Sequence, residues 1–276
     1  MLSFDFEYYR PDTIEEAIGI YKELERIKKQ SLYFSGGTEV VSMARKGVLK
    51  FDALIDLKGI KEMKDYASNE EEIYFGANMT LNEVAEQDSF PLLKQVVETI
   101  ADHTVRNRIT LGGNICGRLG YREAVLPFLL VDAEVCIAGA EGVKTLAMEK
   151  AFDRRLKLSS GEFVTGFKVK SSGSSLGGIS IRKVRTTDVD YPLLHIAAME
   201  DEKGIKLAVS GLCPYPFRSK ALEQYLNDIE GSDWDIKSIY ELLPSQVKDD
   251  NIASSEYRKA VFEKSIEKLL RKRGEA

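Results

Sequence analysis

The chain has 276 residues, of which 39 are lysine or arginine and 44 are aspartate or glutamate, so its formal net charge is −5 with both histidines neutral. This mild acidity argues against a general nucleic-acid binder, which usually carries a basic face. No apolar run approaches the roughly 18–20 residues of a membrane-spanning helix, and the opening residues lack the apolar stretch of a secretory signal, so we expect neither. Three separate cysteines indicate a cytoplasmic protein. With two histidines, they are too few and too scattered for a metal or iron–sulfur site, so we expect no metal in this chain.

Residues 1–58 are predicted to form a small strand–helix–strand–strand unit. The helix begins with a capping-box pattern at Thr13, and its apolar residues recur at helical spacing. The predicted elements are a strand at 4–8, a helix at 13–28 and strands at 32–34 and 53–57.

Residues 59–172 are predicted to mix strands and short helices. A second capping-box pattern at Thr80 opens a short helix, and Pro91 begins the next one. A loop is expected to end in residues 109–114. The other predictions are strands at 72–79, 133–139 and 162–170 and helices at 80–87, 91–100 and 122–131.

A Gly/Ser-rich stretch at 171–178 is the best candidate for a domain boundary. Beyond it, the pattern predicts strands at 179–185, 193–199 and 205–212, then helices at 217–227, 235–243 and 254–272. Because strands and helices are grouped apart, the sequence indicates an α+β fold rather than a doubly wound sheet.

Two glycine pairs are the first candidates for a functional site. Ser35-Gly36-Gly37-Thr38 follows a predicted strand, and Leu111-Gly112-Gly113-Asn114 ends the predicted loop. Consecutive backbone N–H groups at such positions can form nests for an anion, and two nests suit a diphosphate. The simpler interpretation is two tight turns, and neither segment fits the Walker A or the dinucleotide GxGxxG pattern.

Other polar residues give weaker signals. His103 and His195 stand alone and are expected to be structural or surface histidines. Lys183 and Arg185 lie on a predicted strand and fit an exposed strand face, and Glu123 fits a helix start, where the dipole favours acids. No nucleophile–base arrangement is legible, so the sequence predicts no catalytic residue.

Longer segments resemble the signature motifs of the FAD-binding (medium) subunits of molybdenum hydroxylases, a family that includes xanthine dehydrogenase and aerobic carbon monoxide dehydrogenase flavoproteins. The resemblance is closest to a divergent, short bacterial branch, because residues 115–127 depart from the family's usual "ASPxxDxxP" continuation. The matching segments, in chain order, are residues 6–11, 34–39 and 101–114, Lys183 with Asp190-Tyr191, and residues 251–258.

The resemblance implies an α+β, two-lobed FAD-binding fold of the vanillyl-alcohol oxidase type. The lobes would be residues 1–58 and 59–172, followed by a C-terminal domain at 173–276 with a three-stranded antiparallel sheet and helices. By the same resemblance, the cofactor-binding residues are Phe34, Ser35, Gly36, Gly37, Thr38 and Glu39 around the diphosphate, Thr110, Gly112, Gly113 and Asn114 on its other side, and Ala101, Glu123 and Lys183 near the cofactor.

The resemblance also implies a function. The chain would carry FAD, take electrons from a two-iron–two-sulfur small subunit in a complex with a large subunit that binds the molybdenum cofactor, and pass them to NAD+ or another acceptor. Two alternatives stay open: a self-contained FAD-dependent oxidoreductase, and an assembly or scaffold protein that has lost FAD.

Overall fold

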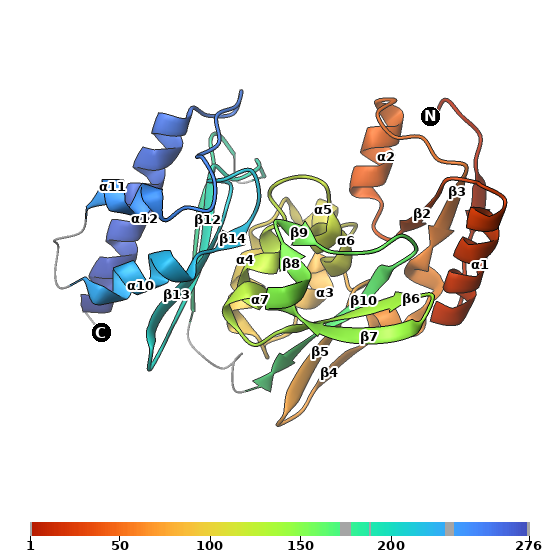
Figure 1. The fold of residues 1–276 in the computed structure, drawn as a ribbon, viewed down its shortest axis with the longest axis horizontal. Coiled ribbons are helices and arrows are strands. Elements are labelled where there is room, and N and C mark those ends of the chain that lie inside the picture. The colour runs from red at the N-terminus through yellow and green to blue at the C-terminus, as the bar shows by residue number, and fades with distance from the viewer. Residues whose placement is uncertain (1, 172–177, 188, 230–234, 275–276) are drawn as a thin grey trace.

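The computed structural model describes residues 2–171, 178–187, 189–229 and 235–274. Figure 1 shows three sheets arranged along the long axis of the molecule, in the order of the chain. Of the helices in these ranges, none has both the length and the hydrophobicity needed to cross a bilayer. The α+β class is confirmed, because parallel and antiparallel sheets occupy separate stretches of the chain.

The first sheet is parallel, with strand order β1-β3-β2. The predicted helix is confirmed: the Thr13 hydroxyl accepts the Glu16 N–H at 3.1 Å and caps it. A second helix, which the sequence did not predict, begins directly after Gly37. The elements are β1 (Glu7–Tyr9), α1 (Ile14–Arg26), β2 (Ser31–Phe34), α2 (Thr38–Arg45) and β3 (Ala53–Asp56).

The central sheet is antiparallel, with strand order β4-β5-β10-β6-β7. The sequence missed edge strand β7 because all six of its residues are exposed and carry no burial pattern. The strands are β4 (Tyr66–Ser68), β5 (Glu72–Gly76), β6 (Glu134–Gly139), β7 (Gly142–Ala147) and β10 (Phe163–Lys170), with a separate hairpin of β8 (Phe152–Asp153) and β9 (Arg155–Leu156).

Short helices join these strands. The Thr80 capping box is present in full, since Thr80 and Glu83 each accept the other's backbone N–H. The predicted loop at 109–114 is wrong, because residues 111–116 form a helix capped by Thr110. The helices are α3 (Leu81–Ala85), α4 (Pro91–Glu98), α5 (His103–Arg106), α6 (Leu111–Cys116), α7 (Leu126–Leu130) and α8 (Met148–Ala151), and the 3-10 turns are η1 (Leu57–Gly59), η2 (Lys61–Lys64) and η3 (Glu123–Val125).

The C-terminal sheet is antiparallel and has four strands rather than the three that were expected, in the order β11-β12-β13-β14. The fourth strand takes the first residues of the helix predicted at 217–227. The predicted boundary at 171–178 lies almost entirely outside the described residues. The elements are β11 (Gly178–Lys183), β12 (Leu194–Asp201), β13 (Gly204–Ser210), β14 (Phe217–Arg218), α10 (Lys220–Asp228), α11 (Ile236–Glu241) and α12 (Ser255–Gly274).

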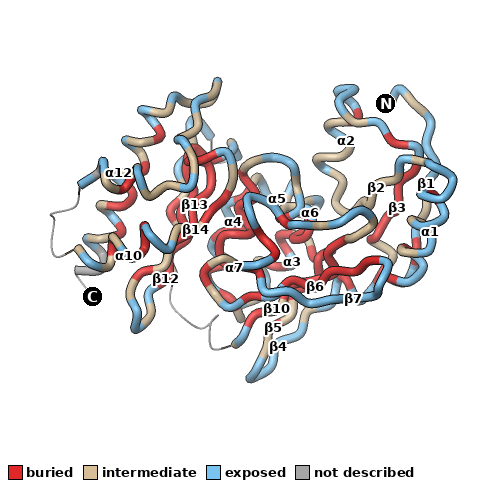
Figure 2. The backbone as a smooth tube through the Cα atoms, viewed as in Figure 1, coloured by how far each residue is buried: buried red, intermediate tan, exposed pale blue. Residues whose placement is uncertain are grey.

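Burial ties the three sheets together. Ile14 of α1 and Phe75 of β5 belong to one apolar core, and that core continues to Ala197 on one face of the C-terminal sheet. The opposite face, which includes Leu207, packs against Phe262 of α12 in a second core. Figure 2 shows this buried backbone in red through the central elements and the C-terminal sheet.

Arg258 anchors helix α12 to the ends of β12 and β13. Its side chain is fully buried, and Nη1 donates to the carbonyl oxygens of Leu193 at 2.8 Å and Gly211 at 2.9 Å. Nη2 donates to Asp250 Oδ1 at 2.8 Å. The carboxylate therefore neutralises a guanidinium that has no access to water.

The contacts of this anchor lower the pKa of Asp250. Burial alone would raise it, but hydrogen bonds from Lys248, Arg258 and two backbone N–H groups outweigh burial and hold the pKa well below its usual range. A carboxylate with a lowered folded-state pKa contributes stability above its unfolded pKa of about 4, and that contribution is lost as the pH falls toward the folded value.

We predict that Asp250→Asn lowers the free energy of unfolding at pH 7 by about 2 kcal/mol, because a buried guanidinium loses its counter-charge. The difference in free energy of unfolding between the variant and the wild type should become smaller as the pH falls from about 5 toward 2. Urea unfolding of both proteins at pH 7, 4 and 3 measures it. A gap that stays constant over this range would contradict the assigned role of the carboxylate.

Candidate functional site

The amino end of helix α2 is the clearest anion-binding feature of the first sheet. Gly37, the residue before the helix, has a left-handed backbone with φ 75°, and no side chain caps the first turn. The first N–H groups of a helix have no partner within it, and the helix dipole makes that end positive. The first predicted nest therefore has donors that are free of side-chain caps.

The two glycines before α2 are also required by packing within the protein. A Cβ added at Gly36 would lie 1.9 Å from the carbonyl oxygen of Arg108, and one at Gly37 would lie 2.3 Å from the Phe34 ring. Beside them, the Ser35 hydroxyl donates to Asn78 Oδ1 at 2.5 Å and lies 3.0 Å from Thr110 Oγ1. The structure thus brings the first glycine motif against the segment that precedes the second.

The second glycine pair lies inside helix α6, and its backbone donors are in use. The N–H groups of Leu111 and Gly112 donate to the carbonyl oxygens of Met79 and Ala77, both at 2.8 Å. The Gly113 N–H donates to Thr110 Oγ1 at 3.2 Å. Unlike the first pair, this segment is satisfied internally, so it contributes close packing rather than an open nest.

Asp56 and Lys58, which sequence reasoning missed, support the loop before α2. Lys58 Nζ donates to both Asp56 oxygens, at 2.8 and 2.9 Å, and to the Ser35 carbonyl oxygen at 2.9 Å, and it lies 4.2 Å from the centroid of the Phe34 ring. Asp56 also accepts the Tyr8 hydroxyl, which raises the pKa of that tyrosine. The available signal was an Asp-Leu-Lys run that begins at the last residue of a buried strand.

Glu39, in the first turn of α2, links this part of the site to the loop after α6. Its carboxylate accepts the Arg118 N–H at 2.9 and 3.0 Å and lies 3.5 Å from the Leu119 nitrogen. A Cβ at Gly117 would lie 2.9 Å from the same carboxylate. The negative charge of Glu39 is therefore bound to backbone donors from another part of the chain.

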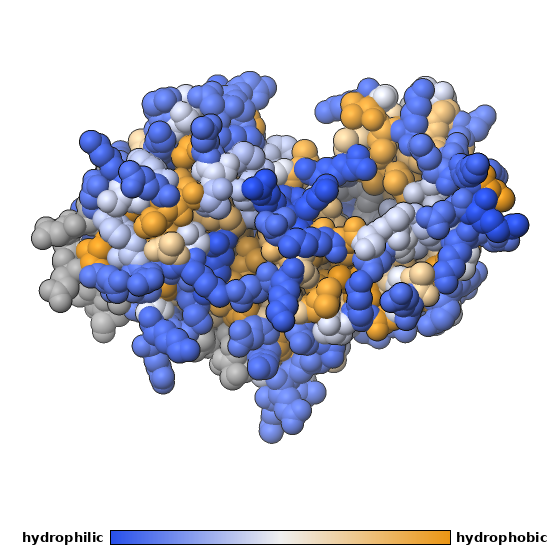
Figure 3. All heavy atoms as spheres, in the orientation of Figure 1, coloured by the Kyte–Doolittle hydropathy of each residue, from blue (hydrophilic) through white to orange (hydrophobic). Residues whose placement is uncertain are grey.

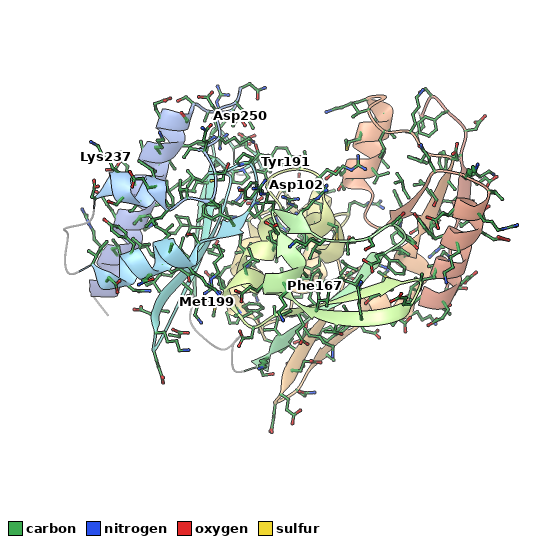
Figure 4. All side chains as sticks on the ribbon, in the orientation of Figure 1. Asp102, Phe167, Tyr191, Met199, Lys237 and Asp250 are labelled. Carbon is green, nitrogen blue, oxygen red and sulfur yellow. The ribbon has the colours of Figure 1, made fainter. Side chains whose placement is uncertain are left out.

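The remaining expected residues lie around the central helices and the C-terminal sheet. Ala101 has an unusual left-handed backbone, with φ 52°, and its carbonyl oxygen accepts Arg106 Nη1 at 2.7 Å. Lys183 is exposed at the end of β11. Tyr191 stacks on Tyr121, with ring centroids 4.7 Å apart and planes 12° apart. Figure 4 shows Tyr191 labelled where the C-terminal elements meet the central helices.

Glu123 and His195 are buried together. Glu123 Oε1 lies 2.7 Å from His195 Nδ1 and accepts Arg182 Nε at 2.9 Å, while His195 Nε2 lies 2.8 Å from Ser180 Oγ. Burial alone would raise the pKa of Glu123, but the hydrogen bond and charge of His195 and the charge of Arg182 hold it below its usual range. His195 is structural, as expected.

Asn114 connects this buried group to α6, because its Oδ1 accepts the Ala124 N–H at 3.0 Å. The space-filling view in Figure 3 shows the upper edge of the molecule hollowed between the part carrying α2 and the C-terminal part, above the central helices. The arrangement places the uncapped amino end of α2 beside Thr110, the residue that caps α6.

Comparison with known proteins identifies the family. Residues 4–169 match the model of the FAD binding domain in molybdopterin dehydrogenase. Over 272 residues the chain is 25% identical to the glyceraldehyde dehydrogenase medium chain of Sulfolobus acidocaldarius, a match that covers 93% of this chain and 94% of that protein.

Solved structures share the whole fold. Carbon monoxide dehydrogenase from Hydrogenophaga pseudoflava matches with a TM-score of 0.84 at 21% identity, over 97% of this chain and 96% of that chain. Quinoline 2-oxidoreductase from Pseudomonas putida 86 matches with a TM-score of 0.83 at 19% identity, over 99% and 98%. The predicted family, fold class and cofactor are confirmed. Because the family model covers more than half of its residues, the chain belongs to the FAD-binding domain family of molybdopterin dehydrogenases and is an oxidoreductase flavoprotein subunit with FAD as its cofactor.

Proposed function

We propose that this chain holds FAD for electron transfer within a molybdenum-containing hydroxylase, with the FAD diphosphate at the amino end of α2. The observation that carries the proposal is the uncapped first turn of α2 behind Gly36 and Gly37. A diphosphate fits this donor set, because helix N–H groups and the helix dipole both favour negative charge. The Phe34–Glu39 segment would wrap the diphosphate.

The other expected residues take supporting places in the proposal. Thr110, Gly112, Gly113 and Asn114 would close the opposite side, a place that the 3.0 Å approach of Thr110 to Ser35 supports. Their contribution would be shape and hydroxyl or amide groups, since the α6 backbone donors already have partners. Ala101 and Lys183 would lie toward the flavin.

The proposed reaction is electron transfer between subunits. Bound FAD accepts single electrons and can deliver a hydride, while the protein supplies position and electrostatics. The electrons would come from a two-iron–two-sulfur small subunit, in a complex with a large subunit holding the molybdenum cofactor, and would pass to NAD+ or another acceptor. A relative named as a medium chain, matched along nearly its whole length, supports a place in such a complex. Three unpaired cysteines support the cytoplasm as its location.

We predict that Gly37→Ala releases FAD while Gly47→Ala keeps it. The two glycines flank α2 with nearly equal backbones, φ 75° and φ 71°, so both variants carry the strain of a left-handed alanine, about 1–2 kcal/mol. At Gly37 the methyl group also meets the Phe34 ring at the proposed diphosphate site, whereas at Gly47 nothing lies within 4 Å.

Visible absorbance per chain after gel filtration, and the thermal midpoint with and without added FAD, measure the difference. FAD at a hundred times its dissociation constant should stabilise the wild type by about 2.7 kcal/mol. Equal FAD retention in the two variants would contradict the placement of the diphosphate at the amino end of α2. A wild type without flavin absorbance or thermal shift would favour the FAD-less scaffold.

We predict that co-expression with a molybdenum subunit and a two-iron–two-sulfur subunit gives one complex in which substrate bleaches the flavin. The isolated chain should oxidise no purine or aldehyde, because its flavin would receive electrons only from clusters on another chain. Turnover of such a substrate by the isolated chain at an enzyme-like rate would favour the self-contained flavoenzyme instead.

A further inference from the structure

We propose that Glu123 is a positioning residue that clamps the C-terminal sheet to helix α6, and not an FAD ligand. The inference rests on the proposed function only in assigning Lys183, which follows Arg182 on β11, to the flavin side of the site. It differs from what the family resemblance implies, which is a carboxylate in contact with FAD at this position.

Two strands converge on one oxygen of Glu123. Arg182 of β11 and His195 of β12 are direct partners in the strand register, and both reach Glu123 Oε1, at 2.9 and 2.7 Å. The side chains of Glu123, Arg182 and His195 are 4%, 9% and 0% exposed, so water competes little for these bonds. A buried carboxylate that is held this way has its charge paired within the protein interior.

The other end of the clamp is the cofactor motif in α6. The N–H of Ala124, the residue after Glu123, donates to Asn114 Oδ1 at 3.0 Å. Two residues before Glu123, the Tyr121 carbonyl oxygen accepts the hydroxyl of Ser210 from β13. Residues 121–124 are therefore bonded on one side to α6 and on the other to three strands of the C-terminal sheet.

The clamp also fixes the loop between β11 and β12. Arg182 Nη2 donates to the Asp190 carbonyl oxygen at 2.6 Å, next to Tyr191, which stacks on Tyr121. Lys183 follows Arg182 directly on β11. The Glu123–Arg182 pair thus sets where Lys183 and Tyr191 lie relative to α6, and Lys183 is one of the residues assigned to the flavin side.

Side-chain length explains why a glutamate suits this position. Aspartate is shorter than glutamate by one methylene group. In this chain the extra length brings the carboxylate to the β11–β12 pair, so the short side chain would leave Arg182 and His195 without their shared acceptor.

A double-mutant cycle tests the clamp. Glu123→Gln, Arg182→Met and His195→Asn are compared singly, and the first is combined with each of the other two. FAD titration of the apo protein, the visible circular dichroism of the bound flavin and urea unfolding of the apo protein are measured for each. We expect every single variant to weaken FAD binding about tenfold and to alter the flavin signal, and each double variant to lose little more than Glu123→Gln alone.

Two further variants separate positioning from stability alone and from direct ligation. Glu223→Gln disrupts another buried glutamate–arginine pair in the C-terminal part, where Glu223 binds Arg218 at 2.7 Å, and should lower stability without changing the flavin signal. Glu123→Asp should behave like Glu123→Gln, because it retains the charge but not the reach.

The proposal is overturned if Glu123→Asp, Arg182→Met and His195→Asn bind FAD like the wild type while Glu123→Gln does not, since Glu123 would then be a cofactor ligand. It is also overturned if all variants lose stability with FAD affinity and flavin signal unchanged. If the wild type binds no FAD, the proposed function fails. The clamp is then tested on its own by urea unfolding of the apo variants, and it is contradicted if the losses in free energy of unfolding of the single variants add up in the double variants.

Discussion

The backbone of Gly36 passes so close to the Arg108 carbonyl oxygen that even a methyl group would lie 1.9 Å from it. This approach joins the first sheet to the central helices and places Ser35 within reach of Asn78 and Thr110. Any side chain at position 36 would drive the two parts of the chain apart. The contact between the start of α2 and the cap of α6 therefore depends on one residue that has no Cβ.

The electrostatics of the site follow from how its charged side chains are already paired. Lys58 is bound to Asp56, and the Glu39 carboxylate is bound to the backbone N–H of Arg118. The groups left to attract an anion are the backbone N–H groups at the start of α2. They have no side-chain cap, and the helix dipole makes this end positive. The proposed anion site would be built on backbone donors and specified by conformation, so its sequence signal would be glycine rather than lysine or arginine.

Local signals predicted much of the fold, and contacts between distant segments explain the rest. The capping patterns at Thr13 and Thr80 predicted their helices because a cap is encoded within four residues. The sequence did not predict helix α6, because Gly112 and Gly113 disfavour a helix. In the structure its first N–H groups are accepted by Thr110 and by the carbonyl oxygens of Ala77 and Met79. The partners of Glu123 lie 59 and 72 residues away, so no spacing rule could reveal them.

The segment at 115–127 is bonded to several distant parts of the fold. Glu39 holds its Arg118 N–H, and the buried Arg122 donates to the carbonyl oxygens of Gly117 and Arg154. Arg122 keeps a left-handed backbone, with φ 34°, that a non-glycine residue rarely adopts without such anchors. Hydrogen bonds therefore tie residues 115–127 to α2 through Glu39, to the β8–β9 hairpin through Arg154 and to the C-terminal sheet through Ser210.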